Sequence, residues 1–182
     1  MAQASTIYVA AIDLADIDRG VYESFELRLA RHPSETAAYM LVRVLAYCFE
    51  YREGIEMTSG LSSGDEPALV VRDLTGQLLA WIEVGLPDAE RLHRGSKAAS
   101  RVAVYTHRDV RQLLAQLQGT RIHRAAEIPI RAFDRVAIDA ASERLDRRSA
   151  FTVTVSGGDV HLSFADETFP ISSIEHRIPP TS

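Results

Sequence analysis

The stretch Leu78-Leu79-Ala80-Trp81-Ile82-Glu83-Val84-Gly85-Leu86-Pro87-Asp88 determines how the rest of the chain is interpreted. Its apolar part predicts a buried strand that Gly85 and Pro87 end, after which Asp88 can open a helix. Glu83 is the one charged residue inside that strand. Because an ionised carboxylate is costly to bury unless it is paired or bound to a metal, the pattern predicts a partner for Glu83.

The composition is that of an ordinary globular protein. The 182 residues are 46% hydrophobic and 25% charged, which predicts one domain over residues 1–182 with a full core. The formal net charge of −5 argues against binding of nucleic acid by bulk electrostatics, but it leaves room for a local basic cleft. The single cysteine, Cys48, excludes an internal disulfide and argues against a cysteine-based zinc site.

The first residues give no sign of secretion or of a membrane span. Residues 1–6 contain no basic region, and the apolar run 7–12 is too short for a signal peptide core or a spanning helix. We therefore expect a cytoplasmic protein with no membrane partner.

Two strands and a helix are predicted before the central stretch. Residues 6–12 and 21–29 have the pattern of a β-hairpin. The next helix is predicted from a first turn at Pro33 to about Arg52, with the negative charge of Glu35 at its positive end. Its core stripe at helical spacing consists of Ala37, Leu41, Val44, Leu45 and Cys48.

The central stretch forms the second arm of a predicted hairpin, and helices and strands alternate after it. The predicted elements are strands 68–72 and 78–84, helix 88–100, strand 101–106, helix 107–118, strand 128–130, helix 134–145 and a hairpin of strands 151–155 and 160–164, with a loop at 57–64. This order predicts an α/β (α+β) fold, in which a mixed central sheet is flanked by helices and carries extra N- and C-terminal β-hairpins.

Two short motifs do not indicate function. Residues 60–64 match the serine-hydrolase pattern G-x-S-x-G, but a loop precedes them and a strand follows, whereas that motif needs a strand and then a helix. His32 and Glu35 have H-x-x-E spacing, but Thr36 stands where an inverted zinc-protease motif needs histidine. The six histidines show no metal-ligand spacing on a single element.

Four carboxylates are expected to converge. Glu35 opens the first helix, Asp65 and Glu66 open one arm of the central hairpin, and Glu83 ends the other arm. Antiparallel pairing brings the two arms side by side, and repulsion among the acids calls for a divalent cation. Oxygen ligands suit Mg²⁺ or Mn²⁺, so Asp65, Glu66 and Glu83 are the predicted metal ligands.

The same acids have a structural interpretation. Arg94 and Lys97 lie on the helix that follows the hairpin and could face the acids from above. In the structural alternative Glu83 forms an ion pair with Arg94 or Lys97, Arg31 also pairs with an acid, and the remaining carboxylates cap a helix or lie on a loop. The pattern alone leaves both interpretations open.

Three separated segments resemble the YaeQ family of bacterial proteins. They are Ala30-Arg31-His32-Pro33-Ser34-Glu35-Thr36, Asp65-Glu66-Pro67 and Trp81-Ile82-Glu83-Val84-Gly85-Leu86-Pro87-Asp88. The resemblance covers nearly the whole chain, with motif order and length in agreement. That family is a variant of the PD-(D/E)XK nuclease-like fold, so the resemblance implies an αβββαβ core of the restriction-endonuclease type.

The resemblance also implies roles for the acids. Glu35 matches the acid of the first core helix, Asp65 or Glu66 matches the first hairpin acid, and Glu83 matches the second. The nuclease pattern places lysine at position 85, where this chain has Gly85.

In some variants of that fold the cation has moved to the next helix, which would make Lys97 or Arg94 its substitute. The implied reaction is phosphodiester hydrolysis, in which a metal polarises the phosphate and activates water. Lys97 or Arg94 would stabilise the developing charge, and Arg31 and His32 would bind a phosphate.

Two functions are therefore expected as alternatives. The first is a metal-dependent nuclease-like enzyme acting on DNA or RNA. The second is a non-catalytic binding or regulatory module on a degenerate PD-(D/E)XK fold, with nucleic acid or a protein as its partner. The acidic balance, the glycine at position 85 and the lack of a clear basic stripe favour the second.

Overall fold

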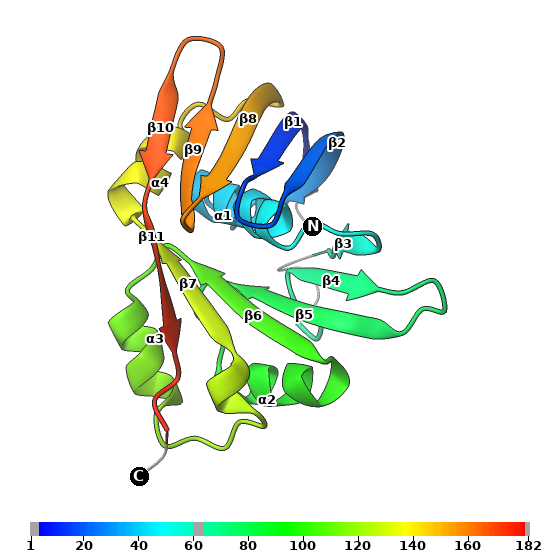
Figure 1. The fold of residues 1–182 in the computed structure, drawn as a ribbon, viewed down its shortest axis with the longest axis vertical. Helices are drawn as coiled ribbons and strands as arrows, with labels where there is room; N and C mark the ends of the chain where they lie inside the picture. The colour runs from blue at the N-terminus through cyan, green and yellow to red at the C-terminus, as the bar shows by residue number, and fades with distance from the viewer. Residues whose placement is uncertain (1–3, 60–63, 181–182) are drawn as a thin grey trace.

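The computed structural model describes residues 4–59 and 64–180, which form an α/β protein with four α-helices and two mixed β-sheets (Figure 1). The helices are α1 (Ala37–Phe49), α2 (Ala89–Ala98), α3 (Val110–Leu117) and α4 (Arg135–Ser142), with a short 3-10 helix η2 (Ala125–Glu127). The strands are β1 (Thr6–Asp16), β2 (Val21–Arg31), β3 (Ile55–Met57), β4 (Leu69–Arg72), β5 (Leu78–Val84), β6 (Arg101–Thr106), β7 (Pro129–Phe133), β8 (Arg148–Ser156), β9 (Asp159–Ser163), β10 (Thr168–Ile171) and β11 (Ser173–Arg177).

Sheet A consists of five strands in the order β10-β9-β8-β1-β2. Strands β1 and β2 pair antiparallel, as do β8 and β9, so both predicted terminal hairpins are present. However, β1 also pairs in parallel with β8, in a register that places Ile12 beside Phe151. The prediction that the hairpins extend a central sheet was therefore wrong, because together they form a separate sheet.

Sheet B consists of six strands in the order β11-β7-β6-β5-β4-β3. Strands β3, β4 and β5 form an antiparallel meander, whereas β5, β6 and β7 run parallel. The order α1-β3-β4-β5-α2-β6 has the αβββαβ succession that the family resemblance implies. Assignment to the nuclease superfamily itself stays a prediction.

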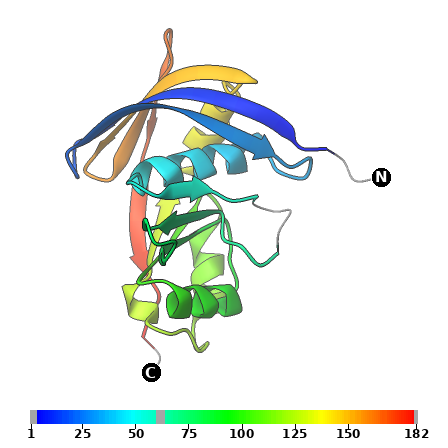
Figure 2. The same cartoon turned by 90° about the vertical axis from the view of Figure 1, so that its right-hand side faces the viewer.

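Helix α1 lies between the two sheets, with sheet A arching over it (Figures 1 and 2). Nine of its residues are buried: Ala38, Met40, Leu41, Val42, Arg43, Val44, Leu45, Ala46 and Cys48. A helix that is apolar on nearly all sides needs cover on more than one side, and the two sheets supply it. Helix α2 covers the opposite face of sheet B, where Leu92 packs in a second core beneath Trp81.

The first helix begins later than predicted. Thr36 is extended and accepts a hydrogen bond from the backbone N–H of Tyr39, so it is the N-cap and the helix starts at Ala37. Pro33 and Glu35 lie in the preceding turn, and the prediction that the helix starts at Pro33 was wrong. The physical reason is that threonine is a strong N-cap.

The same helix also ends earlier than predicted, at Phe49 instead of about Arg52. Arg19, from the β1–β2 turn, donates from Nη2 to the carbonyl of Cys48 at 2.9 Å and from Nη1 to the carbonyl of Tyr51 at 2.9 Å. An arginine that is distant in sequence thus bonds carbonyl groups at the end of the helix, which have no partner within the helix itself.

Three short strands were not predicted. Strand β3 includes residue 57 of the predicted loop, and β10 and β11 follow the C-terminal hairpin. The G-x-S-x-G match at 60–64 lies outside the described residues except for Gly64. No helix in the described part of the chain is long and apolar enough to span a membrane.

Candidate functional site

A cavity of about 380 Å³ lies at the carboxyl ends of β5 and β6. In sheets with parallel strands, ligands usually bind outside these ends. Six polar residues line the cavity: Tyr39, Glu66, Glu83, Asp88, Arg91 and Arg108. Position and composition make it the candidate functional site.

Glu83 is the buried acid of this site. Its Oε1 accepts hydrogen bonds from Trp81 Nε1 at 2.8 Å and from Arg91 Nε at 3.1 Å. Burial raises the pKa of Glu83, and the charge of Arg91 and the Trp81 bond only partly offset that effect. The predicted need for a partner is confirmed, although the partner is Arg91 and not Arg94 or Lys97.

Arg91 places its guanidinium group among four oxygen atoms. Besides Glu83 Oε1, it donates from Nη2 to Glu83 Oε2 at 3.4 Å and to the carbonyl of Glu66 at 2.7 Å, and from Nη1 to the carbonyl of Gly64 at 2.6 Å. One cation therefore links the acid-bearing strand to the segment that precedes β4. Its planar fork suits such multiple contacts.

Glu35 is occupied by a different arginine. Arg43 Nη1 lies 2.8 Å from Glu35 Oε1 and 3.1 Å from Oε2, and both side chains are only 2% exposed. Arg43 lies on α1, whereas Arg91, the partner of Glu83, lies on α2 across sheet B. The two acids therefore form separate buried ion pairs on opposite sides of the sheet.

Tyr39 and Gly85 form one wall of the cavity. Tyr39 donates its hydroxyl to the carbonyl of Val84 at 3.3 Å, and burial raises its pKa to about 12. Gly85 has φ +97°, and a Cβ atom there would lie 3.3 Å from Cε2 of Tyr39. A lysine at the position expected by the nuclease pattern would meet both backbone strain and this ring.

The remaining predicted metal ligands and cations lie near the surface. The Asp65 side chain is 91% exposed and pairs with Arg94 at 3.1 Å. Glu66 lines the cavity, and its carboxylate accepts a 3.4 Å hydrogen bond from Ser59. Lys97 is exposed on α2, and we find no ion pair for it in the described chain.

The predicted phosphate-binding residues make local contacts. Arg31 donates from Nε to the carbonyl of Glu35 at 2.9 Å and from Nη1 to the hydroxyl of Tyr8 at 3.1 Å. His32 Nδ1 lies 2.7 Å from the hydroxyl of Ser34. Neither Arg31 nor His32 lines the cavity at Glu83.

The residues present do not fit a divalent cation as they are arranged. Within residues 4–59 and 64–180, no three His, Cys, Asp or Glu side chains are grouped to hold a metal. Both oxygens of Glu83 already accept bonds from Arg91, and the exposed carboxylate of Asp65 pairs with Arg94. A metal bound to Glu83 would have to displace Arg91.

Arg91 and Arg43 were missed by sequence reasoning, although the sequence carried a signal for each. Arg43 is the only charged residue in the helix 37–49, just as Glu83 is the only one in its strand. A charged residue that is alone in an apolar run indicates a buried ion pair with a residue elsewhere in the chain, and this holds for Arg43 and for Glu83. Arg91 lies three residues after the N-cap Asp88, in the turn nearest the end of β5.

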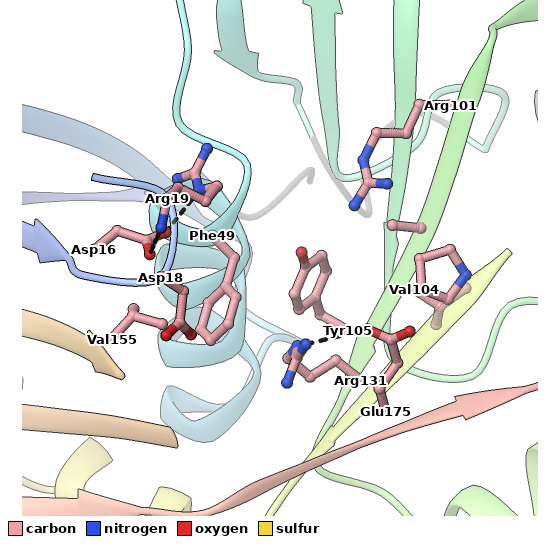
Figure 3. Close-up of a pocket in the computed structure, with 12 residues that line it drawn as sticks. Asp16, Asp18, Arg19, Phe49, Arg101, Val104, Tyr105, Arg131, Val155 and Glu175 are labelled. Atoms are coloured by element: carbon pink, nitrogen blue, oxygen red, sulfur yellow. Dashed lines mark hydrogen bonds and ion pairs between the residues drawn. The ribbon is translucent and has the colours of Figure 1, made fainter. Parts of the chain in front are cut away.

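A smaller cavity of about 160 Å³ lies between the sheets (Figure 3). On one side Arg131 pairs with Glu175 at 3.2 Å, with its guanidinium 5.0 Å from the ring centre of Phe49. Arg101, also on this side, makes two bonds of 2.6 and 2.8 Å to Glu50. The cavity lies where the two layers meet, since residues of both sheets line it, and its arginines Arg101 and Arg131 are paired with acids of the protein.

Fold and site together define an α/β protein in which a buried acid, held by an arginine, faces a cavity at the carboxyl ends of parallel strands. The family model described as YaeQ protein matches residues 1–173. This chain belongs to the YaeQ family.

Relatives and solved structures agree with this placement. The chain is 34% identical to "Uncharacterized protein YaeQ" of Salmonella typhi over 172 residues, covering 94% of this chain and 95% of that protein. The crystal structure of YaeQ protein from Pseudomonas syringae matches with a TM-score of 0.84 and 33% identity, covering 94% and 95% of the two chains. The YaeQ structure from Xanthomonas axonopodis pv. citri matches with a TM-score of 0.85 and 28% identity, covering 96% and 99%.

Proposed function

We propose that this protein binds nucleic acid through phosphate contacts at the carboxyl ends of β5 and β6, without hydrolysing it by a divalent cation. One observation carries the proposal. Arg91 supplies a positive charge to the buried acid and to two backbone carbonyls, at the place where a nuclease would hold its metal. A permanent cation in the protein makes a metal unnecessary for stabilising Glu83.

The charge of the segment that follows β5 favours a phosphate-bearing ligand, although of its cations only Arg91 and Arg108 line the cavity. The whole chain carries −5, but residues 85–128 contain eight Lys and Arg against four Asp and Glu. The eight are Arg91, Arg94, Lys97, Arg101, Arg108, Arg111, Arg121 and Arg124. Arg108 is exposed and lines the cavity, whereas Arg94 and Lys97 are exposed further along α2, Lys97 in its last turn, so a phosphate backbone that runs from the cavity along the helix can reach all three.

Gly85 supports the non-hydrolytic form of the proposal. The catalytic lysine of the nuclease pattern has no counterpart there, and the backbone at φ +97° disfavours any side chain. Lys97, one of its two expected substitutes, is exposed and does not line the cavity.

A second candidate is metal-dependent hydrolysis of DNA or RNA. It is favoured by the position of Glu83 in the wall of the cavity and by the αβββαβ order of the elements. It requires Arg91 to leave the Glu83 oxygens so that Mg²⁺ or Mn²⁺ can reach them.

The test measures binding and cleavage on the same substrates. Fluorescently labelled single-stranded RNA and double-stranded DNA are titrated with the protein in EDTA, in Mg²⁺ and in Mn²⁺, and the products are separated on denaturing gels. We expect affinity that is equal in all three buffers and falls with salt, with no cleavage. The variant Arg94→Glu with Lys97→Glu should lose about tenfold or more in affinity, since two phosphate contacts become repulsive.

The matched control is Arg147→Glu with Arg148→Glu, which makes the same charge change at the start of β8 in the other sheet. It should leave the affinity nearly unchanged. Cleavage that requires a metal and is lost in Glu83→Gln would establish the second candidate instead. If neither nucleic acid binds, or if both double variants weaken binding equally, the proposed site is wrong.

A further inference from the structure

Strand β2 is the outermost strand of sheet A and has one free edge. It is eleven residues long and pairs with β1 along its whole length. In Figure 1 it ends the upper sheet, and in Figure 2, viewed from that side, no described element covers its outer edge. A long, regular edge of this kind offers unpaired backbone N–H and C=O groups to another strand.

The sequence of β2 is complementary to itself. It reads Val21-Tyr22-Glu23-Ser24-Phe25-Glu26-Leu27-Arg28-Leu29-Ala30-Arg31. If two copies pair antiparallel with Leu27 opposite Leu27, Glu26 of each copy faces Arg28 of the other. The same register places Glu23 opposite Arg31. Directly opposed unlike charges stabilise antiparallel pairs, whereas like charges destabilise them.

Neighbouring symmetric registers lose this complementarity. Moving the axis to position 26 places Glu26 opposite Glu26, and moving it to position 28 places Arg28 opposite Arg28. An axis at Leu27 avoids both repulsions. Residues 26 and 28 both point away from the side of the buried Leu27, so each facing pair lies on one face and the solvent faces of the two sheets stay on the same side.

The charges are available for a partner. The side chains of Arg28 and Glu26 are 70% and 58% exposed, and they contact each other only at 3.8 Å within the strand. Pairing between copies would replace this weak contact by two pairs related by the two-fold axis.

A half-buried aromatic cluster lies along the same edge. The ring of Phe25 stacks on Tyr51 with centroids 4.8 Å apart and lies 5.5 Å from the ring of Tyr47. All three remain partly exposed between β2 and the end of α1. A second copy at the edge would bring its Leu29 opposite Phe25 and so cover apolar surface as well as backbone.

We propose that the protein forms a two-fold dimer through antiparallel β2–β2 pairing centred on Leu27, which joins two five-stranded sheets into one continuous sheet. This interface lies on sheet A, away from the cavity at Glu83, and it does not depend on the proposed nucleic-acid binding.

The test is a charge exchange read by sedimentation velocity or light scattering. The wild-type chain should have twice the 20.1 kDa mass of one chain. The single variants Glu26→Arg and Arg28→Glu should each be monomeric, because both pairs between positions 26 and 28 at the centre of the interface become repulsive. An equimolar mixture of the two should dimerise again, since one carries only positive and the other only negative charges at these positions.

Circular dichroism checks that each variant is folded, and the combined variant Glu26→Arg with Arg28→Glu gives an independent reading because it should dimerise alone. Glu56→Arg, on the edge strand β3 of sheet B, is the control and should stay dimeric. A wild-type chain that is monomeric up to millimolar concentration, or single variants that remain dimeric, would overturn the proposal.

Discussion

Gly85 stands where the nuclease pattern implied by the family resemblance has lysine, and its backbone conformation disfavours a side chain. With φ +97° it lies in a region that residues with a side chain rarely adopt, and the Tyr39 ring lies close to the space a Cβ would need. The difference from that pattern therefore lies in the backbone conformation of the turn between β5 and α2, and not only in one missing side chain.

Gly85→Ala should lower the free energy of unfolding by about 1–3 kcal/mol, because strain and contact with Tyr39 add. Urea unfolding measures the change. Gly20→Ala is the matched control, since Gly20 also has positive φ but has no atom within 4 Å of its would-be Cβ. Equal losses in the two variants would show that the Tyr39 contact contributes nothing.

Glu83 gives a pH prediction with a definite sign. Its pKa is raised in the folded protein, mainly by burial, above the ordinary value of 4.5. The folded state therefore holds this proton more tightly, and the stability from Glu83 is full below pH 4.5 and is lost as the pH rises through the folded pKa.

In urea unfolding from pH 7 to pH 4.5, wild type should gain stability relative to Glu83→Gln, which cannot titrate at this position. Comparing the two chains at each pH removes the contribution of all other titrating groups. A relative loss on acidification would mean that Arg91 outweighs burial and that the pKa of Glu83 is lowered.

At the residue scale the sequence predicted that Glu83 needs a partner, and the structure confirms this. It did not identify Arg91, because that choice depends on the direction in which α2 leaves Pro87. Glu35 was predicted to join the same site, but its pairing with Arg43 depends on α1 being enclosed by two sheets, which strand patterns alone do not reveal.

At the scale of elements, α2 is fixed to sheet B by Trp81 and Gly95. A Cβ atom at Gly95 would lie 2.6 Å from Cγ and Cδ1 of Trp81, so the indole ring packs directly on the helix backbone. The same indole donates to Glu83. The position of α2, and hence of Arg91, therefore depends on this contact.

Gly95→Ala should destabilise the protein by about 1–3 kcal/mol through overpacking, although alanine favours an isolated helix by about 1 kcal/mol. Trp81 is the only tryptophan, so its fluorescence reports the displacement of the ring directly. Lys97→Ala, on the exposed side of the same helix, should change stability by less than about 0.5 kcal/mol. A stabilised Gly95→Ala variant would contradict the close packing.

The strongly apolar elements were predictable, and the short ones were not. Strands β4, β5 and β6 and helix α3 lie close to where the sequence placed them. Strand β3 has only three residues, β10 contains Pro170, and β11 is largely polar. Such segments become strands because they pair with the edge of a neighbouring strand. That pairing depends on the tertiary structure, which the local sequence pattern does not contain.

At the scale of the whole molecule, the N-terminal and C-terminal hairpins are joined by hydrogen bonds between residues that lie far apart in the sequence. Asp18, in the β1–β2 turn, accepts hydrogen bonds from the backbone N–H groups of Gly157 and Gly158 at 2.8 and 2.9 Å. These bonds lower the pKa of Asp18 below its ordinary value of 3.8. The contact supports the parallel β1–β8 pairing that unites sheet A.

Asp18→Asn should therefore be less stable than wild type at neutral pH, and the difference should shrink below pH 3.8. The sign follows from the lowered pKa, since the stability is present above the unfolded value and is lost as the pH falls through the folded value. Thermal unfolding at several pH values measures it. A difference that stays constant on acidification would exclude the charge of Asp18 as its cause.

The central claim is that Arg91, and not a divalent cation, neutralises the acid at the end of β5. The most direct test is a crystal of this protein soaked in Mn²⁺ and measured at a wavelength where manganese scatters anomalously. We predict no anomalous peak at Glu83, with the Arg91 guanidinium still bonded to Glu83 and to the carbonyls of Gly64 and Glu66. A peak within 2.0–2.4 Å of the Glu83 oxygens, roughly the distance of a bound hard cation, with Arg91 displaced, would contradict the account.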